Sequence, residues 1–475
     1  MASNQEAASQ RQRSEDRARG QPQKLCQQGP GAPLILQAWI NPMRPLLALR
    51  VSESDQKQGI AVPLNPGKSG QRLHGSPKHL AWLSRKTSQM DSRPRPTGLR
   101  KGFLQNRMTQ SHSILADQVR TLIGRSPKPE NLLDAPEPPP ADWEAVALNL
   151  FALQYETVPA YRLLCDARGR RPEEVRSWLE IPAVPTQAFQ ELEFTAIAPE
   201  ARTRVFHSSG TTAQRPSRHF HHAESLALYE ESLRPWFAAH LLASDDTFPL
   251  GLRPRCLALT PQPANAPHSS LVHMLEVVIQ DFGGTGSGFT GRVGGDGAWE
   301  LGLEATLDAL ESACADGIPT LVLGTAFLFV HLFDALSAQG RSFRLPAGSR
   351  VMETGGYKGR SRSLPRAELH AAIAQQLGDP KIIPEYGMSE LSSQAYESGG
   401  RFQFPPWVRI RTIHPETGLD TAEGEPGILR IHDLANVWSV AALETSDLGR
   451  RHGQSFELLG RAAEAELRGC SRMTL

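Results

Sequence analysis

Small hydroxyl residues and one glycine form a short run directly after a predicted strand at residues 203–206. The run consists of Ser208, Ser209, Gly210, Thr211 and Thr212. Backbone N–H groups and hydroxyls in such a loop can donate hydrogen bonds to a polyphosphate, and Arg215 and Arg218 follow as positively charged partners. The GxxxxGK(S/T) spacing of a Walker A loop is absent. The run therefore predicts a phosphate-binding loop, although a flexible turn can have the same composition.

A second group of residues follows a predicted strand at residues 382–383. Tyr386 beside Gly387 offers a ring that can stack on a purine, and the carboxylate of Glu390 can hold Mg²⁺ near phosphate oxygens. A loop tyrosine and a solvated acid would give the same pattern. This motif therefore points to a nucleotide only in combination with others.

A third group lies near the end of the sequence. A carboxylate such as Asp447 at a strand end can accept both hydroxyls of a ribose. Arg461, after Gly460, can add a donor to the ribose or to a phosphate. Each residue alone also fits a turn acid or a surface arginine. The three groups together predict a nucleotide site.

Strands and helices alternate from about residue 200 onward. We predict helices at residues 326–336 and 363–377, and strands at 320–323, 382–383, 408–413 and 428–432. Strands that alternate with helices predict a largely parallel, doubly wound sheet. Ligands of such sheets bind beyond the carboxyl ends of the strands, where the first two groups lie.

The first part of the chain has a different composition. Residues 1–107 are rich in Gln, Ser, Arg, Pro and Gly and show no sustained periodicity, which predicts a disordered or low-complexity extension. The domain that carries the motifs is predicted at residues 108–475.

Composition excludes several classes of protein. The net charge of +1 and the absence of a basic aromatic patch argue against a nucleic-acid partner. The 5 cysteines are odd in number and widely spaced, which favours reduced thiols. The sequence has no apolar segment suited to a secretory signal or a membrane span. A cytoplasmic protein is therefore predicted.

The order and spacing of the motifs resemble the adenylate-forming superfamily of acyl- and aryl-CoA ligases, and most closely its acyl-protein synthetases of bacterial bioluminescence operons. SSGTTAQRPSR corresponds to the phosphate loop, with Ala213 where glycine is usual; YGMSE corresponds to YGxTE, and TSD to TGD, with Ser446 in the glycine position. The resemblance covers residues 108–475. It implies an α/β fold: a large domain with doubly wound, mostly parallel sheets and a small C-terminal β-rich part.

The resemblance also implies roles for particular residues. Gly355 and Gly356 lie in ETGGYKG, where the superfamily has its adenine-contacting loop. The expected cofactors are ATP and magnesium, with Glu390 as catalytic residue and metal ligand. The expected nucleotide-binding residues are Ser208, Ser209, Gly210, Thr211, Thr212, Gly355, Gly356, Tyr386, Gly387, Asp447 and Arg461.

The end of the sequence favours the acyl-protein synthetases. CoA ligases continue well past the GR motif into a C-terminal lid domain, whereas this sequence ends at Leu475, so we expect no lid domain. Acyl-protein synthetases carry the acyl group on a cysteine near the C-terminus, which implies that Cys470 is the catalytic acceptor. The neighbouring Arg468 can favour its thiolate. An incidental thiol would also fit this position.

The resemblance implies a ligase, of the acid–thiol and long-chain-fatty-acid–protein type, that converts a carboxylic acid, expected to be a fatty acid, into an acyl-adenylate. The acyl group would then pass to a protein cysteine and on to an acyl-reductase or other acceptor protein. Two alternatives remain open from the sequence. One is an acyl- or aryl-CoA ligase that works without its own lid, and the other is a catalytically inactive adenylate-binding protein. The identity of the acid and the oligomeric state cannot be derived from the sequence.

Overall fold

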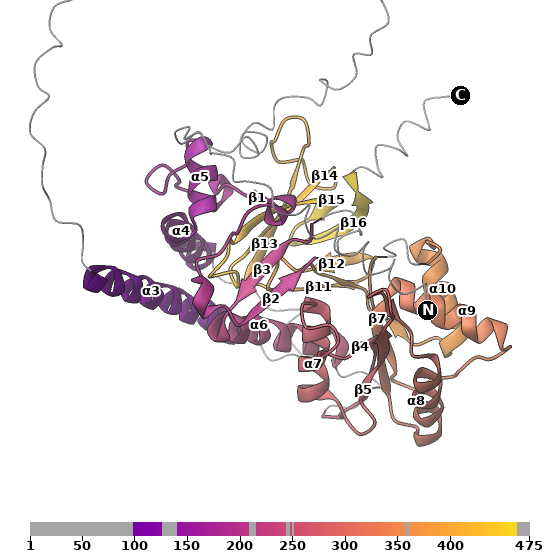
Figure 1. Cartoon of the computed structure of the whole chain (residues 1–475). Helices are drawn as coiled ribbons and strands as arrows, with labels where there is room; N and C mark the ends of the chain where they lie inside the picture. Colours follow the sequence, from indigo (N-terminus) through magenta and orange to yellow (C-terminus); the bar gives the residue numbers. More distant parts are fainter. Residues whose placement is uncertain are drawn as a thin grey trace, which may run out of the picture. The chain divides into compact units, whose positions relative to one another are not determined.

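The computed structural model of the chain describes residues 98–125, 140–208, 215–243, 248, 251–356 and 361–462 (Figure 1). Five of the predicted site residues lie outside this part of the chain: Ser209, Gly210, Thr211, Thr212 and Cys470.

Six parallel strands form the centre of the large sheet. They are β4 (Arg255–Pro261), β5 (Gly288–Val293), β7 (Thr320–Thr325), β8 (Arg350–Thr354), β9 (Lys381–Ile382) and β10 (Glu385–Tyr386). All pairings among these six are parallel. β7 is buried at every position, as its apolar sequence requires of a strand covered on both faces.

Helices cover both faces of this parallel region (Figure 1). On one face lie α6 (Ala223–Leu241) and α7 (Ser270–Phe282), and on the other lie α8 (Leu303–Asp316), α9 (Ala326–Ala338) and α10 (Arg366–Leu377). Alternate residues of β7 point to opposite sides: Leu321 and Leu323 pack with α6 and α7, whereas Val322 packs with α8 and α9. The predicted doubly wound α/β architecture is therefore confirmed.

Helix ends agree with the predictions within a few residues. α9 begins at Ala326, as predicted. α10 begins at Arg366 rather than at residue 363, since Pro365 has an extended ψ of 141° and occupies the N-cap. It ends at Gly378, whose φ of 81° lies in the left-handed region that favours glycine.

The C-terminal part of the sheet is antiparallel. It contains β11 (Ala395–Ser398), β12 (Arg401–Gln403), β13 (Val408–Ile413), β14 (Pro426–Asp433), β15 (Ala442–His452) and β16 (Ser455–Arg461). The strand order is β13-β14-β15-β16-β12-β11-β10-β8-β7-β4-β5-β6, and the last strand, β6 (Trp299–Glu300), pairs antiparallel with β5. The parallel and antiparallel regions meet at β10, so this strand connects both parts of the predicted site.

The N-terminal elements pack against the antiparallel region. They are α3 (Gly98–Arg125), α4 (Pro140–Thr157), α5 (Pro159–Ala167), the 3₁₀ turns η2 (Trp178–Glu180), η3 (Thr186–Gln190) and η4 (Pro199–Ala201), and β1 (Val184–Pro185), which pairs with β15. α4 is anchored by Trp143, whose Nε1 donates a 3.1 Å hydrogen bond to the carbonyl of Trp407. α3 extends across the predicted boundary near residue 107, which stays a prediction. Within the described ranges, no helix combines the length and apolarity that crossing a bilayer requires.

A separate two-stranded hairpin carries the start of the predicted phosphate loop. Its strands are β2 (Arg204–His207) and β3 (Arg218–His221), with Phe206 opposite His219 and His207 opposite Arg218. Ser208 directly follows β2 and Ser217 directly precedes β3. The hairpin therefore brings these two serines side by side.

Candidate functional site

Three predicted nucleotide-binding residues from distant parts of the sequence meet beside β10. The Tyr386 hydroxyl donates a 2.8 Å hydrogen bond to Oδ2 of Asp447. Arg461 lies opposite Asp447 in the β15–β16 register, with its Nε 3.8 Å from Oδ1. Burial and the Asp447 carboxylate raise the pKa of Tyr386 well above its ordinary value, so its hydroxyl stays protonated and remains a donor. The arrangement offers a fixed carboxylate oxygen pair next to an exposed guanidinium.

Two residues that the sequence reasoning missed hold the backbone around Asp447. Thr445 Oγ1 accepts a 3.0 Å hydrogen bond from the backbone N–H of Asp447. Gln187, in η3, donates to the Ser446 hydroxyl. The Thr445 contact was detectable in principle, because Ser and Thr side chains often bond the backbone two residues on. The Gln187 contact spans distant segments and has no local signal.

Glu390 is almost completely buried, at 5% exposure. Its Oε2 accepts a 2.9 Å hydrogen bond from the Ser389 hydroxyl, and Ser217 lies next in line, with its Oγ 3.3 Å from that of Ser389. Burial raises the pKa of Glu390, while the nearby serine hydroxyls and the positive charge of Arg461 act in the opposite direction. The carboxylate is therefore held by hydroxyls rather than by an ion pair.

The β2–β3 hairpin reaches this carboxylate through Ser389. The backbone N–H of Ser217 donates a 3.0 Å hydrogen bond to Oγ of Ser208. His219 places its Nδ1 2.7 Å from the carbonyl oxygen of Ser389. Because burial lowers the pKa of His219 to about 4, its ring is neutral and Nδ1 is the donor. The structure thus connects Ser208 to Glu390, whereas the rest of the predicted phosphate loop lies outside the described residues.

The predicted glycines lie at the ends of neighbouring parallel strands. Gly355 and Gly356 follow β8, which pairs with β10 through Thr354 and Glu385. Gly356 has a φ of 113°, a conformation that favours glycine. Among the described residues, a Cβ on Gly355 would meet no atom within 4 Å. Open space at this glycine leaves room for a ligand.

Gly387 is a glycine for a different reason. A Cβ there would lie 2.4 Å from Oε1 of Glu385. Glu385 is itself fully buried, and burial raises the pKa of its carboxyl group to about 7. The sequence reasoning did not identify Glu385, because an acid beside an aromatic residue in a strand carries no distinct signal. Gly387 therefore lets this buried carboxyl group lie beside the loop.

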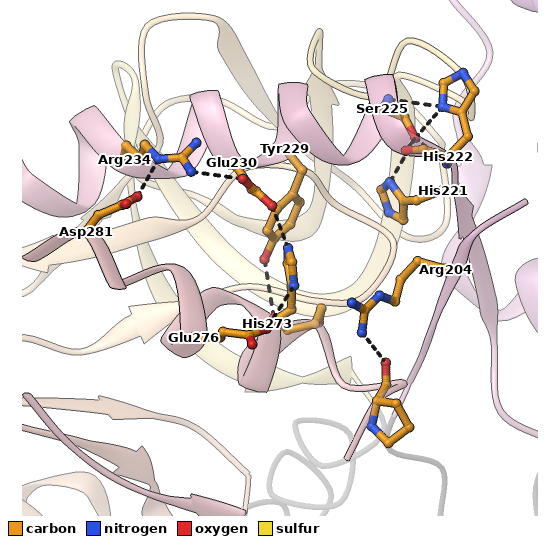
Figure 2. A network of polar contacts seen from close by, with 12 residues as sticks. Arg204, His221, His222, Ser225, Tyr229, Glu230, Arg234, His273, Glu276 and Asp281 are labelled. Atoms are coloured by element: carbon orange, nitrogen blue, oxygen red, sulfur yellow. Dashed lines mark hydrogen bonds and ion pairs between the residues drawn. The ribbon is translucent and has the colours of Figure 1, made fainter. Parts of the chain in front are cut away.

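A polar network joins α6, α7 and β3 behind the hairpin (Figure 2). His273 of α7 approaches Glu230 of α6 at 3.2 Å, and Arg234 bridges Glu230 and Asp281. His222 caps α6 by accepting from the backbone at its first turn. His221 of β3 also contacts α6, with its Nδ1 3.3 Å from the Ser225 hydroxyl, so the hairpin is held against this helix.

One carboxylate alone does not make a magnesium site. Within the described ranges, no cluster of three or more His, Cys, Asp or Glu side chains is arranged to hold a metal ion. Mg²⁺ is usually bound by one or two carboxylates together with substrate phosphates. Glu390 fits this pattern, since it would supply one oxygen ligand and phosphate oxygens would supply others.

The fold and these residues define a class first. A doubly wound α/β domain, with Tyr, Asp, Arg and a buried Glu beside the junction of its parallel and antiparallel strands, has the architecture expected of an adenylate-forming enzyme. In the sequence comparison, the model of the family described as "Acyl-protein synthetase, LuxE" matches residues 256–474. The predicted resemblance is confirmed over this part of the chain.

A curated relative agrees with this family. The long-chain-fatty-acid–luciferin-component ligase of Vibrio harveyi is 24% identical over 184 residues, which cover 36% of this chain and 49% of the relative. The chain thus spans about half the length of that relative.

Similar solved structures are more distant. A 2-hydroxyisobutyryl-CoA ligase in complex with 2-HIB-AMP matches with a TM-score of 0.49 and 14% identity over 69% of each chain. ATP-bound MatB from Rhodopseudomonas palustris matches with a TM-score of 0.37 and 15% identity over 66% of this chain and 61% of its own.

Proposed function

We propose that this chain activates a carboxylic acid with ATP and forms an acyl-adenylate and pyrophosphate. The observation that supports this function is the convergence of Tyr386, Asp447 and Arg461 beside β10, with Glu390 and Ser208 joined to the same strand end. These are the chemical groups that hold a base, a ribose and a polyphosphate. Similarity to acyl-protein synthetases supports the same reaction.

In the proposed reaction, a carboxylate oxygen of the acid attacks the α-phosphorus of ATP. The new phosphorus–oxygen bond forms as the bond to the bridging oxygen of pyrophosphate breaks, and the electron pair leaves with pyrophosphate. The protein needs to align the reactants and neutralise charge rather than form covalent bonds in this step. Magnesium, when bound, would neutralise charge on the phosphate oxygens.

The described residues divide this work. Asp447 would accept the ribose hydroxyls, with its orientation fixed by Tyr386. Arg461, which is exposed, would donate to the ribose or to a phosphate. Glu390 would hold the metal, and Ser208 would donate to the phosphates together with the hydroxyls of the predicted loop.

We further propose that the acyl group passes to a protein thiol, with Cys470 as the acceptor. The thiolate would attack the acyl carbon, and AMP would leave with the oxygen that joined it to the acid. The proposed acid is a fatty acid, because the curated relative is a long-chain-fatty-acid ligase. An acyl-reductase or another acceptor protein would then take the acyl group from the thioester.

Exchange of labelled pyrophosphate into ATP tests this function. We expect exchange that requires magnesium and one class within a panel of fatty, aryl and hydroxy acids. Cys470→Ser should retain exchange and lose the covalent acyl label on the protein. Formation of acyl-CoA when CoA is added would instead favour a CoA ligase. Tight nucleotide binding without exchange for any acid would favour an inactive adenylate-binding protein.

A further inference from the structure

A chain of hydrogen bonds leads from the hairpin to the Glu390 carboxylate. Because the Ser389 hydroxyl donates its proton to Glu390, it can only accept from Ser217, so the Ser217 hydroxyl is the donor across their 3.3 Å contact. Both serines are buried, at 1% and 5% exposure. The protons therefore all point toward the carboxylate.

The same serine also orients Ser208. Its backbone N–H donates to Oγ of Ser208, which occupies one lone pair and leaves the Ser208 hydroxyl hydrogen for another acceptor. His219, two residues along β3, holds the Ser389 carbonyl. Ser217 is thus the residue at which the hairpin and the segment that carries Glu390 are joined.

We infer that Ser217 is a positioning residue. It sets the Glu390 carboxylate through Ser389 and so lets magnesium strengthen nucleotide binding. This inference rests on the proposed function and adds a residue that the motif comparison did not contain. Without the Ser217 hydroxyl, Ser389 would still donate to Glu390. It would no longer accept the hydrogen bond that fixes its own rotamer. The Glu390 oxygens would then be held less firmly, and magnesium would strengthen nucleotide binding less.

The molecule contains a matched control. Ser232 is also 1% exposed, and its Oγ lies 2.9 Å from that of Ser393, which donates to the buried carboxylate of Asp433. Ser232→Ala therefore removes the same kind of buried serine–serine contact at a position outside the proposed site.

The test is calorimetric binding of α,β-methylene-ATP to the full chain, with magnesium and with EDTA. For Ser217→Ala we expect the gain in affinity from magnesium to fall about 3- to 10-fold relative to wild type, with the EDTA affinity unchanged within about twofold. Ser217→Thr should restore the gain. Ser232→Ala should not alter it.

A second variant keeps the inference testable if Ser217→Ala folds poorly. Ser389→Ala should show at least the same loss, and the double variant should lose no more than Ser389→Ala, because both changes break one chain. An unchanged magnesium effect in Ser217→Ala, or an equal loss in Ser232→Ala, would overturn the inference while leaving the proposed function intact. Failure of the wild-type chain to bind the nucleotide at all would contradict both.

Discussion

Two buried serine–serine–carboxylate chains pass through the β10–β11 connection and end at different carboxyl groups. One runs from Ser217 through Ser389 to Glu390, and the other from Ser232 through Ser393 to Asp433. Both carboxyl groups are almost completely buried, and burial raises the pKa of each. The chemistry of the two chains is therefore similar, and their surroundings separate them.

The Asp433 carboxylate is held by three donors of the protein. It accepts from the Ser393 hydroxyl and from the backbone N–H groups of Ser392 and Ala435, at 2.9 to 3.0 Å. Trp407 Nε1 donates to the hydroxyl oxygens of Ser232 and Ser393. Such a carboxylate has no reason to bind a ligand, and its role is to hold β14 and the β10–β11 connection together.

Glu390 has fewer donors and lies next to the predicted nucleotide-binding residues. Among the described residues, its carboxylate accepts one hydrogen bond, from the Ser389 hydroxyl, whereas that of Asp433 accepts three. Among the same residues, no backbone N–H group of another segment donates to Glu390, whereas backbone N–H groups of Ser392 and Ala435 donate to Asp433. The comparison teaches that a buried carboxylate is a functional candidate when its oxygens retain unused acceptor capacity.

Glu390→Gln should have the largest effect. The amide keeps the shape but removes the charge that would hold magnesium, so acid-dependent exchange should fall about 100-fold or more. Stability at neutral pH should stay the same or rise, because burial raises the pKa of Glu390 and so disfavours its charged form in the folded chain. Exchange rates and urea unfolding of the same preparation check both expectations. Wild-type exchange in this variant would exclude a metal role for Glu390.

Asp433→Asn should give the opposite result. The amide nitrogen would face donors that now meet a carboxylate oxygen, which should cost roughly 2–3 kcal/mol of unfolding free energy. The folded fraction should retain its exchange rate per molecule. Urea unfolding with exchange measured at low denaturant separates the two quantities. A large loss of exchange rate without a loss of stability would show that Asp433, like Glu390, has a functional role, and would contradict the distinction between these two carboxyl groups.

Glu385 extends the comparison to a third buried carboxyl group. Its pKa rises from 4.5 to about 7, mainly through burial. The protonated form is therefore favoured in the folded chain, and its stabilisation is complete below pH 4.5 and is lost as pH rises through 7. The slope approaches about 1.4 kcal/mol per pH unit within that window. Glu385→Gln should thus gain stability relative to wild type between pH 5 and pH 8 in urea unfolding, whereas parallel stability curves would contradict the assignment.

Alanine substitutions at Gly355 and Gly387 should have the smallest effects. They compare a glycine beside open space with a glycine beside a buried side chain. A Cβ on Gly355 meets no atom of the residues that the structure describes within 4 Å, so Gly355→Ala should leave the melting temperature unchanged. If adenine occupies that space, nucleotide affinity should fall about 5- to 10-fold. Gly387→Ala should instead disturb the chain itself, because Oε1 of Glu385 lies 2.4 Å from the added carbon. Unchanged affinity in Gly355→Ala would place the adenine elsewhere.

Local patterns predicted most of the fold and part of the site. Helical spacing and apolar runs gave α9, β7 and the alternation that builds the doubly wound sheet, because these depend on periodicity. The start of α10 was misplaced by three residues, since Pro365 shifted the cap. The meeting of Tyr386 with Asp447 followed from motif order, whereas Ser217, Gln187 and Glu385 did not, because their contacts cross segments that share no periodic signal.

The fate of the acid's oxygen atoms tests the central claim most directly. Wild-type chain is incubated with ATP, magnesium, hydroxylamine and an acid that supports exchange, labelled with ¹⁸O in both carboxyl oxygens. Hydroxylamine attacks the acyl carbon, so AMP retains the oxygen that joined it to the acid. The proposed function predicts AMP that carries one ¹⁸O by mass spectrometry. Unlabelled AMP, or ADP as the nucleotide product, would contradict it.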